Sequence, residues 1–336
     1  MKFKNTINSL LLALLLILVS MAGCSQQTPS ANSAPLKVRF ILDYLPNTNH
    51  TGVYIARDLG YFAEEGLEVE IIQPTEGATA TLIAAGQGEF GVSYQEDVTY
   101  ARTAADPLPI KAIAAILQHN TSGFASAKEK NITSPKDFAG KTYAGWGSPA
   151  EEAIIRAVMV RVGADPDTLK IVQSTGSNSI ITPQSQVDLN WIYYGWTGIE
   201  AELLNVELNY LPLADLHPAL DFYTPVIIAA ESYLAKNEET ARKFLRAVAK
   251  GFEYCISNPR EASELFVKAV PEYSLDLIER STHYLNDYYI ADAPRWGEMT
   301  ADRWDAYTQF MLNNQLIDKT MPAPEAFTND YLSPAK

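Results

Sequence analysis

Polar and aromatic side chains are concentrated in one segment near the start of the chain. Residues 43–52 read DYLPNTNHTG and lie between a strand pattern and a helix pattern. Carboxylate, phenol, amide and imidazole groups placed there can hydrogen-bond a small polar solute, and the free amides of the helix start can add theirs. Asp43, Tyr44, Asn49 and His50 are therefore candidate ligand contacts. The alternatives are that Asn49 only caps the helix and that His50 only orients a neighbour.

Two further segments offer one candidate contact each. Glu96 follows a short apolar strand pattern and can accept hydrogen bonds from amino or ring N–H groups, although the helix dipole alone would also favour an acid there. Trp146 lies between two glycines in residues 145–151, GWGSPAE, where a ligand can approach the backbone closely. The segment lacks the lysine of a P-loop and the spacing of a dinucleotide fingerprint. Trp146 is therefore a candidate stacking wall.

The densest aromatic cluster comes later in the chain. Residues 191–202 read WIYYGWTGIEAE, with aromatic side chains at four of the first six positions. Flat rings stack on Trp and Tyr, and carboxylates accept hydrogen bonds from ring N–H or amino groups. Strand alternation places Trp191 in the core, and we expect Tyr194, Trp196 and Glu200 nearer the ligand. Together these segments predict a site for a flat ring that carries hydrogen-bond donors.

The sequence contains few patterns that are typical of catalysis. The chain has four His and two Cys, no His pair at metal-ligand spacing, and neither a G-x-S-x-G nor an H-E-x-x-H motif. We therefore expect a binding protein rather than an enzyme, with no metal and no cofactor. Cys255 lies in an apolar helix pattern and is expected to be a core residue.

The elements that must position these residues alternate between strand and helix. Strand patterns occupy residues 37–42, 67–72, 90–93 and 110–117, and helix patterns occupy 52–59, 78–85 and 96–104. A second series follows Gly123, with strands at 142–145 and 168–172 and a helix at 150–162. This succession predicts an α/β fold with mostly parallel sheets and helices on both faces.

An internal echo links the two series. Residues 86–94 (GQGEFGVSY) and 185–193 (SQVDLNWIY) each contain a polar turn, an acid and an apolar strand that ends in Tyr. We interpret the echo as two lobes of similar design. Ligands of open α/β sheets bind beyond the carboxyl ends of the strands, so two facing sheets predict a ligand cleft between the lobes.

The last third of the chain is mostly helical after one apolar strand. That strand is expected at residues 225–230, and helices are expected at 238–256, 259–270, 275–285 and 301–314. Such a tail would wrap back onto the first lobe. The predicted organisation is lobe 1 at residues 36–122 plus 225–336 and lobe 2 at residues 123–224.

The amino terminus has the features of a lipoprotein signal peptide. Residues 1–23 contain two early lysines and an apolar run from Leu10 to Val19, too short for a membrane span. Cys24 follows small residues, where bacterial lipoproteins carry their lipid, and residues 24–35 form a polar, Pro-containing tether. The prediction is an extracytoplasmic protein, lipid-anchored to the cell membrane through Cys24. An ordinary cleaved signal with an incidental Cys is the alternative.

The charge of the mature chain limits its partners. Removal of residues 1–23, which carry two lysines and no acids, takes the formal net charge from −14 to −16. A strongly acidic surface argues against binding to nucleic acid or to anionic lipid headgroups. We expect a monomer that binds a small solute.

The motif at residues 43–56, DYLPNTNHTGVYIA, resembles the thiamine-pyrimidine group of solute-binding proteins. This group includes the ThiY-type formylaminopyrimidine-binding lipoproteins of bacterial thiamine-salvage ABC importers and the related fungal thiamine pyrimidine synthases. The resemblance covers nearly the whole mature chain, through residues 60–67, 86–96, 145–152, 194–202 and 238–259. Asn49 and His50 match the first-lobe motif of the group, and residues 145–151 and 194–200 match its second-lobe wall.

The resemblance implies a type II periplasmic-binding-protein fold, with two α/β lobes that hold the ligand by aromatic stacking and hydrogen bonds. The implied ligand is a thiamine pyrimidine precursor, N-formyl-4-amino-5-aminomethyl-2-methylpyrimidine or a close analogue, and the implied partner is an ABC permease. Riboflavin or another flat heteroaromatic, or a sulfonate, is the alternative ligand class. A synthase is disfavoured, because residues 221–228 lack the Cys-rich run of the fungal enzymes and no Lys beside His50 could hold pyridoxal phosphate.

Overall fold

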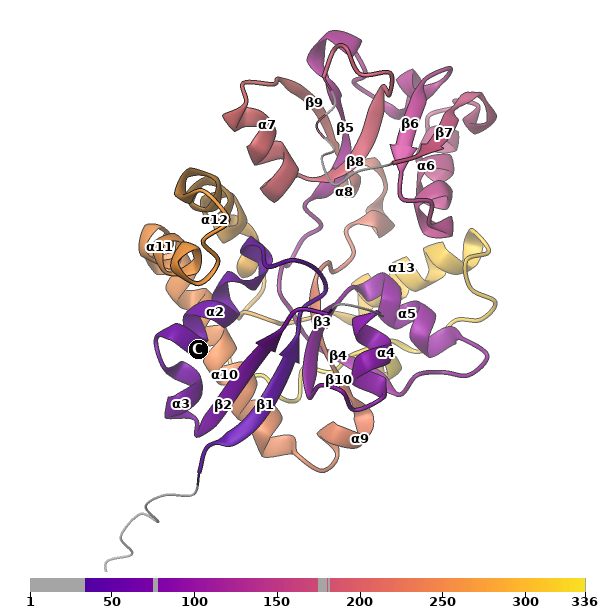
Figure 1. Ribbon diagram of the computed structural model, residues 1–336. Coiled ribbons are helices and arrows are strands. Elements are labelled where there is room, and N and C mark those ends of the chain that lie inside the picture. The colour runs from indigo at the N-terminus through magenta and orange to yellow at the C-terminus, as the bar shows by residue number, and fades with distance from the viewer. Residues whose placement is uncertain (1–33, 75–77, 175–179, 181, 336) are drawn as a thin grey trace, which may run out of the picture. The chain divides into compact units, whose positions relative to one another are not determined.

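Two five-stranded sheets form the framework of the computed structural model, which describes residues 34–74, 78–174, 180 and 182–335 (Figure 1). The signal segment 1–23, the lipidation site Cys24 and nearly all of the tether lie outside the described residues, so they stay predictions. No described helix has both the length and the apolar composition needed to cross a membrane.

The first sheet has the strand order β2-β1-β3-β10-β4. Its strands are β1 (Leu36–Ile41), β2 (Leu67–Ile72), β3 (Phe90–Ser93), β4 (Ile110–Ala115) and β10 (Val226–Ala230). Separate buried apolar clusters lie on its two faces, one around Phe40 and one around Ile228. Because both faces are covered, the inner strands β3 and β10 are buried at every position, whereas the edge strand β2 alternates.

The second sheet has the order β7-β6-β8-β5-β9. Its strands are β5 (Ser122–Ala127), β6 (Thr142–Gly145), β7 (Lys170–Gln173), β8 (Leu189–Tyr193) and β9 (Leu208–Pro212). The two halves of the predicted echo occupy matching places, because β3 and β8 are the central strands of their sheets. The echoed acids also match: Glu89 accepts from the backbone N–H of Arg39 on β1, and Asp188 accepts from that of Thr142 on β6.

Both sheets are mixed: in each sheet four strands run in one direction, in line with the expectation of mostly parallel sheets, and one strand runs against them. β1 is parallel to β2 and β3, and β6 is parallel to β7 and β8. β10 runs antiparallel to β3 and β4, and β5 runs antiparallel to β8 and β9. The reason lies in the chain path: β5 and β10 each enter their sheet from the other sheet, so no helical crossover within one sheet fixes their direction.

Helices cover the first sheet on both sides (Figure 1). They are α2 (Thr51–Asp58), α3 (Tyr61–Glu64), α4 (Thr79–Ala84), α5 (Gln95–Thr103), α9 (Glu231–Leu234), α10 (Glu238–Ser257) and α14 (Ala323–Ala326). Helix α11 (Pro259–Ala269) packs on α2, α10 and α12 (Leu275–Tyr289). On one side α10 supplies Phe244, which stacks on Phe90 of β3 at 4.2 Å between ring centroids. Cys255, at the end of α10, is buried and free, as its apolar surroundings predicted.

Helices α2 and α10 cross at two glycines. A Cβ on Gly251 would lie 2.0 Å from the carbonyl oxygen of Gly52, and a Cβ on Gly52 would lie 2.4 Å from the ring of Phe252. Only the missing side chains let the two backbones come this close. The crossing matters for the site, because α2 begins directly after the polar 43–50 segment.

The helices near the second sheet are α6 (Pro149–Arg161), α7 (Ile199–Leu203) and α8 (Leu213–Leu216), followed in the tail by α12 (Leu275–Tyr289) and α13 (Ala301–Asn313). Short 3-10 turns occur at Thr48–His50, Lys128–Lys130, Pro135–Phe138, Pro166–Thr168 and Pro218–Leu220, and a π-helix at Tyr194–Gly198. The tail packs on both sheets: α12 buries Leu285 and Tyr289 in the first core, and α13 buries Tyr307 and Phe310 in the second. The tail therefore packs on both lobes, whereas the sequence predicted its return to lobe 1.

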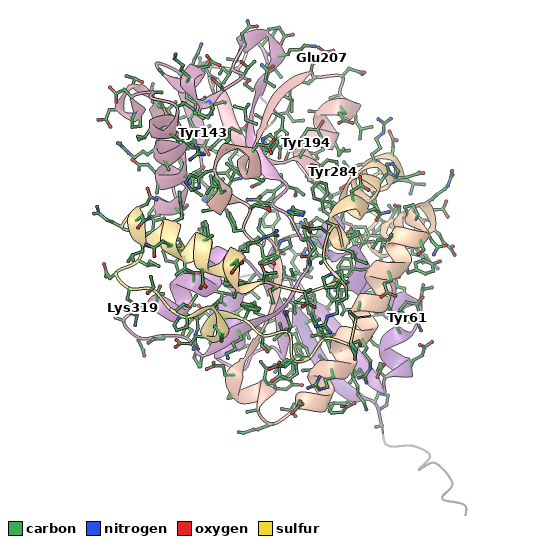
Figure 2. All side chains as sticks on the ribbon, turned by 180° about the vertical axis from the view of Figure 1, so that it is seen from behind. Tyr61, Tyr143, Tyr194, Glu207, Tyr284 and Lys319 are labelled. Carbon is green, nitrogen blue, oxygen red and sulfur yellow. The ribbon has the colours of Figure 1, made fainter. Side chains whose placement is uncertain are left out.

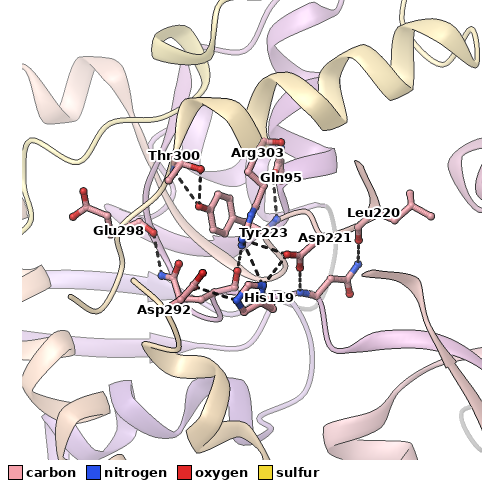
Figure 3. A network of polar contacts seen from close by, with 11 residues as sticks. Gln95, His119, Leu220, Asp221, Tyr223, Asp292, Glu298, Thr300 and Arg303 are labelled. Atoms are coloured by element: carbon pink, nitrogen blue, oxygen red, sulfur yellow. Dashed lines mark hydrogen bonds and ion pairs between the residues drawn. The ribbon is translucent and has the colours of Figure 1, made fainter. Parts of the chain in front are cut away.

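The chain crosses between the sheets twice, at residues 116–121 and 213–225. These two crossings meet in a polar network (Figure 3). The Asn120 backbone N–H donates to Asp221 at 2.9 Å, and Nδ1 of His119 lies 2.7 Å from the same carboxylate. Nε2 of His119 lies 3.1 Å from Asp292, and Arg303 pairs with Asp221 at 3.3 Å. Carboxylates accept hydrogen bonds, so this arrangement favours the protonated imidazole of His119. The hydrogen bond to Asp221, with the charges of Asp221 and Asp292, raises the pKa of His119.

Candidate binding site

A cavity of about 470 Å³ opens where the two sheets, the crossings and the tail meet. Its volume lies in the range of small-molecule sites. The wall from the first sheet is Asp43, Tyr44, Leu45, Asn47, Thr48, Asn49 and Tyr94. The wall from the second sheet is Tyr193, Gly195, Trp196, Thr197 and Glu200. The crossings add Thr121, Thr224 and Pro225, and the tail adds Tyr273 and Leu285.

Strand ends position the main polar groups of this cavity. Asp43 follows β1, Tyr94 follows β3, and Tyr193 is the last residue of β8. Tyr94 and Tyr193 are the two tyrosines that close the predicted sequence echo, so equivalent residues of the two sheets line one cavity. The arrangement agrees with the expectation that ligands of open α/β sheets lie beyond the carboxyl ends of the strands.

Asp43 is held as a carboxylate by two neighbours. His50 Nε2 lies 2.7 Å from one oxygen, and the Tyr94 hydroxyl donates to the other in a short hydrogen bond. Burial alone would raise the pKa of Asp43, but the hydrogen bonds from His50 and Tyr94 outweigh burial and lower the pKa. The cavity therefore contains a fixed negative charge whose geometry the protein sets.

His50 supports this carboxylate from within the core. It is completely buried and is not among the lining residues. Its Nδ1 accepts from the backbone N–H of Asn47 at 3.1 Å, so Nε2 carries the proton that is donated to Asp43. This is the orienting role weighed for His50 from the sequence, and direct contact with a ligand stays a prediction.

Two asparagines of the 43–50 segment have different roles: Asn47 stabilises the turn and Asn49 is available to a ligand. The Asn47 side chain caps the 3-10 turn by accepting from the Asn49 N–H at 3.0 Å. Asn49 lines the cavity, and its side-chain amide makes no hydrogen bond to another described residue. Asn49 is thus free to bond a ligand, while Asn47 shapes the turn.

The second wall is built on the π-helix Tyr194–Gly198, an uncommon element that is frequent at functional sites. Trp196 lies edge-on to Tyr273 of the tail, with ring centroids 4.9 Å apart, which fixes the indole at the cavity. Glu200 lines the cavity from the start of α7, and burial raises its pKa. Trp196 and Glu200 therefore line the cavity, and their contact with a ligand stays a prediction.

Tyr194 turns away from the lining. Its hydroxyl donates to Glu202 at 2.6 Å, and its ring packs on Tyr210 and Tyr284 at 4.7 and 5.2 Å. Figure 2 shows Tyr194 and Tyr284 side by side. Trp191 is buried in the second core, as the strand alternation predicted.

Glu96 and Trp146 also lie outside the described lining, so their contact with a ligand stays a prediction. Glu96 accepts from the hydroxyl of Tyr307 at 2.7 Å, and burial raises its pKa to about 7. Trp146 is 51% exposed and packs edge-on against Trp191 at 5.1 Å. Its loop is held by the buried carboxylate of Glu151, which accepts from the Gly147 N–H at 2.9 Å.

No Lys, Arg or His is among the described residues that line the cavity. The charged groups there are the carboxylates Asp43 and Glu200, and the aromatic lining is Tyr44, Tyr94, Tyr193, Trp196 and Tyr273. The site is therefore suited to a flat molecule with hydrogen-bond donors and unsuited to an anion. Within the described residues, no group of three or more His, Cys, Asp or Glu is arranged to hold a metal.

Comparison with known proteins gives relatives along nearly the whole chain. A formylaminopyrimidine-binding protein of Halalkalibacterium halodurans is 27% identical over 327 residues, which cover 95% of this chain and 98% of the relative. A 4-amino-5-hydroxymethyl-2-methylpyrimidine phosphate synthase of Legionella pneumophila is 24% identical over 310 residues, or 90% and 94% of the two chains.

The fold is also found among solved structures. The periplasmic aliphatic sulphonate-binding protein SsuA of Escherichia coli superposes with a TM-score of 0.67 at 13% identity, over 88% of this chain and 99% of SsuA. This likeness confirms the predicted periplasmic-binding-protein fold of two α/β lobes. The family model described as "NMT1/THI5 like" matches residues 47–262, from the first cavity segment into α11. The chain therefore belongs to the NMT1/THI5-like family.

Proposed function

We propose that the chain is the solute-binding lipoprotein of an ABC importer and that it captures a thiamine pyrimidine precursor. The proposed ligand is N-formyl-4-amino-5-aminomethyl-2-methylpyrimidine or a close analogue. The observation that carries the proposal is the cavity wall, in which aromatic rings surround the carboxylates Asp43 and Glu200. A pyrimidine ring stacks on such a wall, and its amino substituents donate to the carboxylates.

Preorganisation supports the assignment of Asp43 as the main polar anchor. Its two protein partners hold the carboxylate in place before a ligand arrives, so little ordering is left for the binding step. A carboxylate oxygen has more than one lone pair and can accept a donor from the ligand in addition. Asn49 and Glu200 are free to recognise the remaining polar groups of the ring.

The relatives support the transport role. The formylaminopyrimidine-binding protein of Halalkalibacterium halodurans aligns with 95% of this chain, and the SsuA likeness extends over both lobes. In the proposed arrangement, Cys24 and the tether 24–35 keep a monomeric protein at the outer side of the cell membrane. Lobe 1 (36–122 plus 225–336) and lobe 2 (123–224) close on the ligand, and the closed form delivers it to a permease.

A binding protein accounts for the site better than a pyrimidine synthase. His50 is fully buried, and both of its ring nitrogens are engaged with Asn47 and Asp43. A reacting imidazole must reach its partner atom within hydrogen-bond distance. The sequence also has no Lys beside His50 for a pyridoxal imine.

A thermal-shift panel tests the ligand class. We expect formylaminopyrimidine at a hundredfold excess over its Kd to raise Tm by about 5 °C, since such an excess adds about 2.7 kcal/mol. An alkanesulfonate should leave Tm unchanged, because the described part of the lining offers carboxylates and no cationic side chain. Riboflavin is the competing flat ring, and a larger shift with riboflavin than with the pyrimidine would reassign the ligand.

Paired variants then test the anchor. Asp43→Asn keeps the shape and removes the charge, so it should weaken pyrimidine binding by about 10- to 100-fold, the value of one charge-assisted hydrogen bond. Asp302→Asn, an exposed change on α13, is the matched control and should leave the affinity unchanged. Equal affinities for the two variants would remove Asp43 from the proposal.

A further inference from the structure

One face of α12 carries a buried polar connection between the two walls of the cavity. Ser281, Leu285 and Tyr289 follow one another at four-residue spacing and so share that face. All three side chains are buried. Leu285 lines the cavity, whereas Ser281 and Tyr289 are not among the lining residues.

The direction of the hydrogen bonds follows from the atoms involved. The Ser281 hydroxyl donates to the carbonyl oxygen of Gly195 in a short hydrogen bond, and it lies 2.6 Å from the Thr48 hydroxyl. A serine has one proton to donate and a carbonyl can only accept, so the Ser281 proton goes to Gly195. Thr48 must therefore donate to Ser281, which gives the chain Thr48 to Ser281 to Gly195.

The two ends of this chain belong to opposite walls. Thr48 lies in the 3-10 turn that follows β1, and Gly195 lies in the π-helix that follows β8. Both line the cavity. Tyr289 fixes the first end further, since its hydroxyl donates to the Thr48 carbonyl oxygen at 3.0 Å.

Gly195 also lets α12 come close to the π-helix. A Cβ at this position would lie 2.8 Å from Cδ2 of Leu285 and 3.3 Å from the ring of Tyr284. The helix is thus packed directly against the second wall, and Ser281 Oγ is the atom that links the Gly195 carbonyl oxygen to the Thr48 hydroxyl. The bridge depends on the hydroxyl of Ser281 itself.

We propose that Ser281 is a positioning residue that holds the two walls of the cavity at the separation that binds the ligand. The proposal rests on the proposed binding function and deepens it. Removal of the hydroxyl leaves the Gly195 carbonyl and the Thr48 hydroxyl without their partner in a buried place. Both groups regain partners when the walls separate and water enters, so the closed arrangement loses population.

The first test measures affinity and dissociation rate with formylaminopyrimidine as the probe. Ser281→Ala should weaken binding on the order of tenfold, the ratio that one lost buried hydrogen bond gives, with most of the change in faster dissociation. The matched control is Ser263→Ala on α11. Ser263 is equally buried, but its hydroxyl donates within its own helix, to Pro259 at 2.7 Å.

The second test needs no ligand, so it separates this proposal from the proposed function. Spin labels at Glu64→Cys on α3 and Leu204→Cys after α7 report the distance between the lobes, with Cys24 replaced by Ser and Cys255 buried. Ser281→Ala should shift the ligand-free distance distribution to longer values, whereas Ser263→Ala should not. Identical distributions for the two variants would overturn the proposal. Failure of wild type to bind the pyrimidine would overturn only the ligand assignment.

Discussion

Glu96 is the described carboxyl group whose titration should dominate the stability of the protein near neutral pH. It lies in the first turn of α5, where Tyr307 donates to it at 2.7 Å. Burial raises its pKa to about 7, the Tyr307 hydrogen bond opposes the shift, and the charges of Asp97 and Glu151 add to it. Glu96→Gln keeps an acceptor for Tyr307 and removes the ionisation.

The sign and the size follow from linkage. The folded pKa lies above the value of about 4.3 for an exposed glutamate, so the folded state keeps a proton that the unfolded state has released. Stability therefore falls as pH rises from about 4.5 to about 7 and levels off above that. Each pKa unit is worth about 1.4 kcal/mol, which sets an upper limit of about 4 kcal/mol for the cost of ionised Glu96 at pH 8.

Urea unfolding at a series of pH values measures this effect. Glu96→Gln should equal wild type at pH 4 and exceed it by about 2 to 3 kcal/mol at pH 8. The exposed Glu152→Gln, on α6, is the matched control and should follow wild type throughout. Tyr307→Phe should extend the fall in stability to higher pH, because it removes the bond that lowers the pKa of Glu96. A constant difference between Glu96→Gln and wild type from pH 4 to 8 would refute the reasoning.

Three further predictions address the crossings, the helix packing and the second wall. The pKa of His119 is raised in the folded state, so protonated His119 stabilises the protein below the unfolded-state pKa, and this stabilisation is lost as pH rises through the folded-state pKa. The Tm of His119→Gln should therefore lie below that of wild type at pH 5 and equal it at pH 9. An equal Tm difference at the two pH values would contradict this. Gly251→Ala places a Cβ 2.0 Å from the Gly52 carbonyl oxygen and should lower stability in urea by about 2 kcal/mol, and an unchanged midpoint would show that the helices can part. Trp196→Ala should weaken ligand binding about tenfold in calorimetry by removing a stacking face, and an unchanged Kd would exclude that role.

Elements with a clear period could be predicted from the sequence. The strands at 67–72, 90–93 and 142–145 have the predicted bounds, since apolar and β-branched residues stand between turn residues. Strand β5, SGFASA, shows no such pattern, because most of its side chains are small and all of its positions are buried. Its burial comes from neighbouring strands that are distant in sequence, so propensity and period contain no trace of it.

The candidate site was only partly predictable for the same physical reason. Polar residues that follow a strand add nothing to a hydrophobic core, so the sequence alone could indicate Asp43 and Asn49 as candidate site residues, and both line the cavity. The echo contained a signal for Tyr193, which matches Tyr94 at the end of the other central strand. Tyr273 reaches the cavity from the turn before α12, and Leu285 reaches it from α12 itself, where the helix pattern looks like ordinary core packing. Tertiary structure alone brings them there.

The most direct test of the central claim is titration calorimetry of the purified chain with N-formyl-4-amino-5-aminomethyl-2-methylpyrimidine. The account predicts one site per chain, a Kd in the micromolar range or below, and a negative heat-capacity change from burial of the ring against the aromatic wall. The same titration with Asp43→Asn should show the 10- to 100-fold loss. Absence of binding to wild type at micromolar concentrations, with the protein folded and free of bound ligand by native mass spectrometry, would contradict the claim.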